Sequence, residues 1–181
     1  MLIKDMKNAV DRTFLSIKNK DLVGIFGDYD VDGATSTALL ARYFLSIKQK
    51  IKTYIPNRQT EGYGPSVNGF ENLIKANAKT IFTVDCGTLS HGPIELAQKT
   101  NVDVIVLDHH QSDTKLPKAC AIVNPNRMDD DSPHGHLAAV GVTFLLIVAV
   151  NRALRGSKWY VDHKEPDLIQ WLDLVALGTV C

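Results

Sequence analysis

The chain has 181 residues, and its 20 lysine and arginine residues balance 20 aspartate and glutamate residues, so the formal net charge is zero. Hydrophobic residues make up 45% of the chain and charged residues 22%, which is typical of a globular protein and excludes a disordered or low-complexity chain. The charge balance also excludes binding to nucleic acid through overall positive charge. A phosphate-bearing ligand must therefore be held locally, by a few residues or by metal ions.

Short apolar runs alternate with amphipathic segments along the chain. Helices are predicted where apolar side chains recur every three to four residues, at 3–18, 35–46, 67–76, 93–100, 137–155 and 166–177. Strands are predicted at apolar runs bounded by glycine, proline or polar residues, at 22–26, 51–55, 80–84, 102–107 and 119–123. Nearly continuous apolar strands that alternate with helices predict an α/β fold, as one doubly wound domain whose mainly parallel sheet carries helices on both faces.

The cysteines and the most apolar segment bear on where the chain works. Cys86, Cys120 and Cys181 lie far apart, which argues against a zinc ribbon or a disulfide framework and fits a reducing cytosol. The N-terminal residues lack the apolar core of a signal peptide. The apolar segment 137–150 is shorter than the roughly 20 residues of a membrane span, so we expect a buried helix there and no membrane partner.

Acidic residues and histidines follow three of the predicted strands. In an open parallel sheet, ligands bind beyond the carboxyl ends of the strands, so Asp30, Asp85 and His109 are candidates for one shared site although they are distant in sequence. The three segments that follow these strands are GDYDVDG at 27–33, DCGT at 85–88 and DHHQ at 108–111.

This set of side chains favours a metal site. Carboxylates gathered at one edge of a sheet repel one another unless cations hold them, and carboxylate with imidazole suits Mn²⁺ or Mg²⁺. An aspartate that bridges two such ions about 3.5–4 Å apart would allow them to activate a water and neutralise a phosphoryl oxygen. Alone, each segment has a plainer interpretation: a solvated turn for 27–33, a helix N-cap for Asp85, and ordinary loop histidines for 109–110. A calcium loop is excluded, because Leu39 occupies the position of the required glutamate.

The same segments resemble motifs one to three of the DHH phosphoesterase superfamily, because GDYDVDG, VDCGT and DHH occur in that order after predicted strands. The segments VDGATSTALL, IPNRQTEGYGPS and GHLAAVGVTF are further similar to the RecJ-like single-strand-specific 5′→3′ exonucleases, and the resemblance covers residues 5–181. It implies a hydrolase with two Mn²⁺ or Mg²⁺ ions that degrades single-stranded DNA in cytoplasmic recombination and repair. It also implies a single-strand-binding protein or a helicase as candidate partners.

The resemblance also implies which residues hold the metal ions. Asp30 and Asp32 match the two motif-one ligands, Asp85 matches the bridging ligand, and His109 matches the motif-three ligand. Asp28 is a candidate further ligand, because many superfamily members have a histidine ahead of motif one that this chain lacks. Alternatively, Asp28 contacts the ligand residues and not the metal ions.

Other residues are candidates for contact with the substrate. By resemblance, His110 would lie near the scissile phosphate and Asp108 would orient the histidine pair. Arg58 could bind two phosphoryl oxygens, and Tyr63 could stack on a base, against the alternative of an unremarkable surface loop. His136 could reach the rim of the site, although a solvated acidic loop is the favoured interpretation of its surroundings.

The resemblance implies that residues 1–181 are a DHH catalytic domain that is incomplete at its C-terminus. The motif-four aspartate would come directly after Cys181, Asp173 is not at the matching position, and the later DHHA1 and nucleic-acid-binding domains are expected to be absent. Two alternatives stay open: a DHH phosphoesterase for oligonucleotides, cyclic dinucleotides or pyrophosphate, and an inactive fragment that binds metal or nucleic acid.

Overall fold

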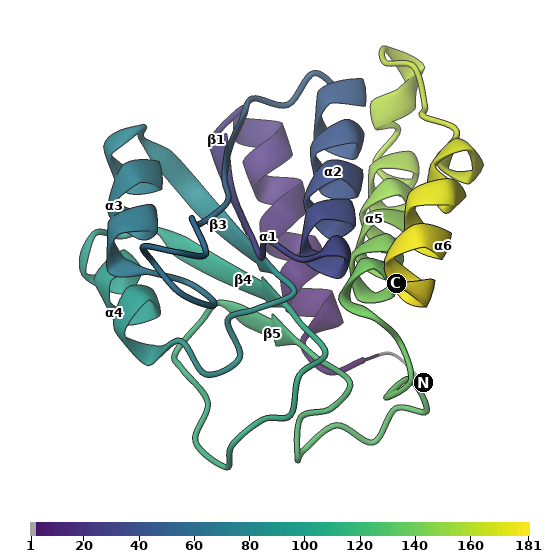
Figure 1. Cartoon of the computed structure of the whole chain (residues 1–181). Coiled ribbons are helices and arrows are strands. Elements are labelled where there is room, and N and C mark those ends of the chain that lie inside the picture. Colours follow the sequence, from purple (N-terminus) through teal and green to yellow (C-terminus); the bar gives the residue numbers. More distant parts are fainter. Residues whose placement is uncertain (1–2) are drawn as a thin grey trace.

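A five-stranded sheet forms the centre of the structure (Figure 1), a computed structural model that describes residues 3–181. Its strand order is β2-β1-β3-β4-β5, and every neighbouring pair is parallel. The strands are β1 Leu22–Gly27, β2 Ile51–Tyr54, β3 Ala78–Val84, β4 Asp103–Leu107 and β5 Ala121–Val123. The inner strands are buried on both faces, which explains their nearly continuous apolar sequences.

Helices cover both faces of this sheet, so the predicted doubly wound α/β fold is confirmed. The helices form a smaller group on one side of the sheet and a larger group on the other (Figure 1), and a separate apolar core lies on each side. The first group consists of α3 (Val67–Lys75) and α4 (His91–Lys99). The second consists of α1 (Met6–Asn19), α2 (Val31–Ser46), α5 (Ala139–Gly156) and α6 (Leu172–Val180), with two short 3-10 turns at Trp159–Val161 and Leu168–Trp171.

The last helix, predicted from residue 166, begins six residues later as α6 at Leu172, because Leu168–Trp171 forms a 3-10 turn. The difference that matters for the acidic segment lies at the start of α2. This helix begins at Val31, four residues before the start predicted from hydrophobic spacing, because the Asp30 side chain accepts the backbone N–H of Gly33 at 2.9 Å and caps the helix. The acidic segment after β1 therefore runs directly into a helix. The first turn of α2 therefore fixes the acidic side chains of this segment at the carboxyl end of the sheet.

Helix α5 is the central helix of the larger core. By length and composition alone it could cross a membrane, but 56% of it is buried inside the fold. Val142, Leu146 and Val150 are almost fully buried, and the helix packs against α1, α2 and α6. The prediction of a buried helix in this apolar segment is confirmed.

The strand order places a topological switch point between β1 and β3. The chain moves outward from β1 to the edge strand β2 and then returns to the other side of β1 as β3, after which it continues to β4 and β5. Ligands of doubly wound proteins bind beyond the carboxyl ends of the strands at such a point. The residues that follow Gly27 and Val84 therefore occupy the expected ligand position.

A buried arginine fastens the N-terminal helix to the loop that follows β5. The guanidinium of Arg127 contacts Oδ2 of Asp5 at 2.7 Å and Oδ1 of Asp129 at 2.8 Å, and it donates to the backbone carbonyl of Ile122 at 2.7 Å. The side chain of Arg127 is only 7% exposed. Part of the acidic run at 129–131 is thus explained by structural ion pairs.

Replacement of Arg127 by methionine is expected to destabilise the fold, because it leaves the Asp5 carboxylate without its buried partner. The loss should be about 3 kcal/mol, the usual range for a buried pair that has lost one member. Urea unfolding in EDTA measures it. Lys7→Met is the control, because the pair of Lys7 with Asp11 is exposed. An equal effect of both substitutions would contradict the structural role of Arg127.

Candidate metal centre

Three aspartates stand side by side at the carboxyl edge of the sheet. Asp28, Asp85 and Asp108 are the first residues after β1, β3 and β4. Each continues the parallel ladder by one residue, because its backbone N–H donates to the last carbonyl of the neighbouring strand, at 3.3, 2.9 and 3.2 Å respectively. The sheet itself therefore brings these three carboxyl groups together, as expected for strand ends.

Two of these carboxylates are buried and have oxygens without a hydrogen-bond partner. Asp28 and Asp85 are each 1% exposed, and neither Oδ1 of Asp28 nor either carboxylate oxygen of Asp85 has a hydrogen-bond partner among the described residues. Burial raises the pKa of Asp85 to about 7 and also raises the pKa of Asp28. Asp85 further adopts a left-handed backbone with φ of 61°, which is uncommon outside glycine. Buried anions without donors are costly unless a cation compensates them.

Motif one completes an acidic group around Asp85. One oxygen each of Asp28, Asp30 and Asp85 lies within 4.8 Å of the others. Gly33 allows this close approach, because a Cβ at Gly33 would come within 2.6 Å of the backbone oxygen of Asp28. The group needs a residue without a side chain where α2 passes the end of β1.

The two histidines form a second group that shares Asp85. Nε2 of His109 lies 3.3 Å from Oδ1 of Asp85, and Nδ1 of His110 lies 3.9 Å from the same oxygen. The ligand atoms of these three residues are also within 4.8 Å of one another. Asp85 therefore belongs to both groups, and its role as a bridging ligand stays a prediction.

Asp108 orients His110 instead of facing the open site. Its Oδ1 lies 2.8 Å from Nδ1 of His110, and its Oδ2 accepts the backbone N–H of Thr88 at 3.0 Å. Burial alone would raise the pKa of Asp108, but the hydrogen bonds from His110 and Thr88 lower it to about 2. The same hydrogen bond raises the pKa of His110 to about 9, so the imidazole is positively charged at neutral pH.

Asp32 occupies a different position from the other acids of motif one. Its Oδ2 accepts the backbone N–H of Ala139 at 2.7 Å, and its Oδ1 accepts that of Val140 at 2.8 Å. Asp32 thus supplies the N-terminal cap that α5 lacks on its own residues. Its Oδ2 is also 3.6 Å from Nε2 of His109. The role of Asp32 as a metal ligand stays a prediction.

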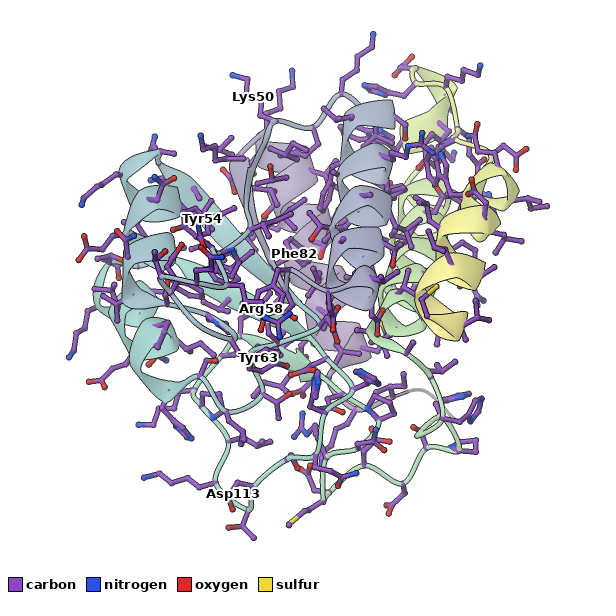
Figure 2. The ribbon with its side chains drawn as sticks, in the orientation of Figure 1. Lys50, Tyr54, Arg58, Tyr63, Phe82 and Asp113 are labelled. Atoms are coloured by element: carbon purple, nitrogen blue, oxygen red, sulfur yellow. The ribbon has the colours of Figure 1, made fainter. Side chains whose placement is uncertain are left out.

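Tyr63 and Arg58 reach this site from the loop between β2 and α3, where both are labelled in Figure 2. The Tyr63 hydroxyl lies 3.2 Å from the backbone oxygen of Asp85 and 3.2 Å from Nε2 of His110. The guanidinium carbon of Arg58 lies 5.3 Å from the ring centre of Tyr29, the residue between Asp28 and Asp30 in the sequence. Both side chains are exposed, so they can contact a ligand.

His136 is exposed in the loop before α5, and its contact with a substrate stays a prediction. Sequence reasoning missed three residues that contact the histidine segment: Thr88, Asn124 and Asn126. The asparagines follow β5 directly, and their position after a fourth strand end was the signal that could have identified them.

The donor set fits divalent cations. Carboxylate oxygens and imidazole nitrogens are the ligands that Mn²⁺ and Mg²⁺ accept, and the orphaned oxygens of Asp28 and Asp85 point to missing positive charge. The residues that would hold the ions are Asp28, Asp30, Asp85 and His109. His110 is engaged with Asp108 and is therefore better placed to contact a substrate.

The family model of the DHH family, N-terminal domain, matches residues 22–179, which include all three strand-end motifs. The chain belongs to the DHH family. The doubly wound sheet and the acidic strand ends described above are thus the DHH fold and its motifs.

Curated relatives in the DHH family carry one name. The chain is 39% identical over 181 residues to the single-stranded-DNA-specific exonuclease RecJ of Escherichia coli (strain K12), and the match covers 98% of this chain and 31% of the relative. It is 36% identical over 178 residues to RecJ of Bacillus subtilis (strain 168), covering 98% of this chain and 21% of the relative. The chain therefore spans between about a fifth and a third of the length of these relatives.

Solved structures agree with this assignment. A crystal structure of exonuclease RecJ bound to manganese superposes with a TM-score of 0.84 at 27% identity, covering 99% of this chain and 43% of that one. RecJ from Thermus thermophilus in complex with Mn²⁺ gives a TM-score of 0.78 at 25% identity, covering 99% and 24%. The expected resemblance to the DHH family and to RecJ is confirmed over nearly the whole chain.

Proposed function

We propose that this chain is the DHH catalytic domain of a metal-dependent phosphodiesterase that degrades single-stranded DNA from the 5′ end in cytoplasmic recombination and repair. The observation that carries the proposal is the pair of metal-ligand groups that share the buried, donor-free carboxylate of Asp85. The names and bound Mn²⁺ of the RecJ relatives support the substrate and the cation. We also propose that a single-strand-binding protein or a helicase is a partner of this protein.

Asp28, Asp30, Asp85 and His109 would hold two divalent cations, and Asp85 is the residue common to both groups of candidate ligands. When bound, such ions lower the pKa of a coordinated water and neutralise charge on phosphoryl oxygens. The chain places its own positive charge next to that position, because His110 is held as an imidazolium by Asp108. His110 would stabilise a non-bridging phosphoryl oxygen, and Arg58 would bind a neighbouring phosphate.

A pocket of about 560 Å³ opens beside His110 and offers room for a nucleoside. Tyr63 and Pro65 line one side, and Gly87 and Leu89 line the other. Leu89 and Tyr63 are 56% and 57% exposed, so apolar and aromatic surface is available for stacking on a base. A mainly apolar wall next to charged ligands is the composition expected of a nucleotide site.

A second candidate function keeps the site and changes the substrate. The residues that hold the cations are suited to phosphate esters in general, so a short oligonucleotide, a cyclic dinucleotide or pyrophosphate is the alternative substrate class. The exposed pair of Arg58 and Tyr63 favours single-stranded DNA, because it offers one phosphate contact and one aromatic ring in the same loop.

The direct test is the release of mononucleotides from 5′-labelled single-stranded DNA in Mn²⁺. We expect hydrolysis by the wild-type chain and a loss of at least about 100-fold in Asp30→Ala and Asp85→Ala, because each removes a metal ligand. Asp167→Ala, an exposed substitution in the segment between α5 and α6, is the control and should keep the wild-type rate. Double-stranded DNA, dinucleotides and pyrophosphate are assayed in parallel.

Each outcome separates the candidates. Preferential hydrolysis of dinucleotides or pyrophosphate would favour the small-substrate alternative. Stoichiometric Mn²⁺ binding without hydrolysis of any substrate would support the third possibility, a domain that binds metal without turnover. Wild-type rates in both aspartate variants would overturn the proposed mechanism.

A further inference from the structure

The histidine segment lies beyond the end of β4, where the sheet no longer supplies partners for its backbone. The backbone N–H groups of His109 and His110 both donate to Oδ1 of Asp108, at 2.8 and 3.2 Å. Their carbonyl oxygens need donors from elsewhere, because backbone polar groups that are shielded from water are costly without partners.

Two asparagine side chains supply these donors. Nδ2 of Asn124 donates to the carbonyl oxygen of His110 at 2.8 Å, and Nδ2 of Asn126 donates to that of His109 at 2.5 Å. Asn124 also donates to Oγ1 of Thr88 at 2.9 Å. All the backbone hydrogen-bonding groups of the histidine pair are therefore held by side chains, from Asp108 on one side and from the asparagines on the other.

A hydrogen bond and a proline restrict the conformation of Asn124 and Asn126. Oδ1 of Asn124 accepts the backbone N–H of Asn126 at 2.8 Å, and Pro125 between them restricts the backbone. Asn124 is fully buried and follows β5 directly. On the other side, Arg127 is fastened to Asp5 of the N-terminal region at 2.7 Å. The sheet edge and the buried ion pair thus fix the asparagines from both directions.

We propose that Asn124 and Asn126 are positioning residues that preorganise His109 of the DHH segment for divalent-cation binding, a role that rests on the proposed function of the site. A ligand that is already fixed loses little conformational entropy when a cation binds, so little of its binding free energy is offset by the cost of ordering its side chain. Groups that orient metal ligands in this way typically contribute about 10- to 100-fold to metal affinity. Asn126 acts on His109, which faces Asp85 directly. Asn124 acts on the same histidine indirectly, because its Oδ1 accepts the backbone N–H of Asn126, and it also holds the backbone of the neighbouring His110.

The test measures Mn²⁺ affinity and fold stability separately. Asn124→Ala and Asn126→Ala are compared with Asn151→Ala, because Asn151 is also buried and hydrogen-bonded, to Glu165 at 2.7 Å and to Tyr160, on the part of α5 remote from the site. Free Mn²⁺ is followed by electron paramagnetic resonance, and the free energy of unfolding is measured with urea in EDTA. We expect the Mn²⁺ dissociation constant to rise about 10- to 100-fold in the first two variants. We expect a change of less than about twofold in Asn151→Ala, even where it loses equal stability.

A merely structural role would lower stability in all three variants and leave the Mn²⁺ dissociation constants unchanged, and that result would overturn the proposal. Should Asn124→Ala fail to fold, Asn126→Ala decides, because Asn126 is only partly buried. Asp85→Ala separates this inference from the proposed function. Loss of Mn²⁺ binding in Asp85→Ala with wild-type affinity in both asparagine variants overturns the positioning role alone. Wild-type affinity in Asp85→Ala overturns the metal site and the positioning role together.

Discussion

Asp85→Asn is expected to make the metal-free protein more stable and to abolish its binding of Mn²⁺. The wild-type carboxylate is 1% exposed, and neither oxygen has a hydrogen-bond partner among the described residues. Nε2 of His109, 3.3 Å from Oδ1, offsets only part of the cost of burying this charge, so the substitution removes a charge that is incompletely compensated. Burial raises the pKa of Asp85 from 3.8 to about 7, and a rise of that size corresponds to a gain of about 4 kcal/mol at pH 8 when the charge is removed. The loss of the bridging ligand should weaken Mn²⁺ binding at least about 100-fold.

The pH dependence of this gain follows from the sign of the shift. The pKa of Asp85 is higher in the folded chain than in the unfolded chain, so the folded state retains a proton that the unfolded state has lost between about pH 4 and pH 7. The metal-free wild type therefore loses stability as the pH rises through this range. The difference between Asp85→Asn and the wild type should grow from pH 4 to pH 7 and then stay constant.

Urea unfolding in EDTA over this pH range measures the effect, and Mn²⁺ titration of both proteins measures the affinity. Asp108→Asn is the matched control, because Asp108 is equally buried but accepts hydrogen bonds from Thr88 and His110. We expect Asp108→Asn to lower stability where Asp85→Asn raises it. Destabilisation of the metal-free protein by Asp85→Asn, to the same extent as by Asp108→Asn, would show that the Asp85 carboxylate is compensated without a cation.

Asp32→Ala is expected to cost more stability than any other change in motif one while reducing metal affinity least. Both oxygens of Asp32 accept backbone N–H groups of α5, from Ala139 at 2.7 Å and Val140 at 2.8 Å. Alanine would leave two buried donors unsatisfied at the start of the central helix. The expected loss is about 3 kcal/mol, from two charge-assisted hydrogen bonds of about 1.5 kcal/mol each.

Asp30→Ala is the comparison that separates the two roles. Asp30 is exposed and caps α2 through a single hydrogen bond to Gly33, so its loss should cost about 1 kcal/mol of stability. Its carboxylate belongs to the group with Asp28 and Asp85, so Mn²⁺ binding should fall at least about 100-fold. Urea unfolding in EDTA and Mn²⁺ titration of both variants give the four numbers. Unchanged stability with abolished Mn²⁺ binding in Asp32→Ala would identify Asp32 as a ligand, as the sequence predicts.

The location of the site could be predicted from the sequence with little help from the structure. Strands buried on both faces require apolar runs, and the ends of those runs are visible because Asp28, Asp85 and Asp108 interrupt them. The parallel sheet then brings strand ends together regardless of their separation in sequence, so GDYDVDG, DCGT and DHH were assigned to one edge before any contact was known. The resemblance to the DHH family rests on the same three segments, whereas the α/β fold is predicted by the alternation of apolar strands with helices.

The roles of individual acids could not be predicted in the same way. Asp28, Asp30 and Asp32 are spaced two residues apart in one short segment, and the residue type alone does not distinguish their roles. Only the folded chain shows that Asp32, on the first turn of α2, caps the N-terminus of α5, a helix that lies more than a hundred residues further along the chain, while its Oδ2 stays 3.6 Å from Nε2 of His109. Resemblance put Asp30 and Asp32 together as ligands, whereas the structure groups Asp30 with Asp28.

An α/β protein with an acidic sheet edge follows from the order of residues alone, because burial pattern and strand-end composition are local properties that a linear sequence retains. Which carboxylates lie buried without donors, as for Asp85, and which are satisfied, as for Asp32 and Asp108, emerged only from the folded chain. The folded chain also revealed Asn124 and Asn126 behind the histidines. Hydrogen-bond satisfaction depends on partners from distant segments, and those partners meet only when the sheet and the helices are packed.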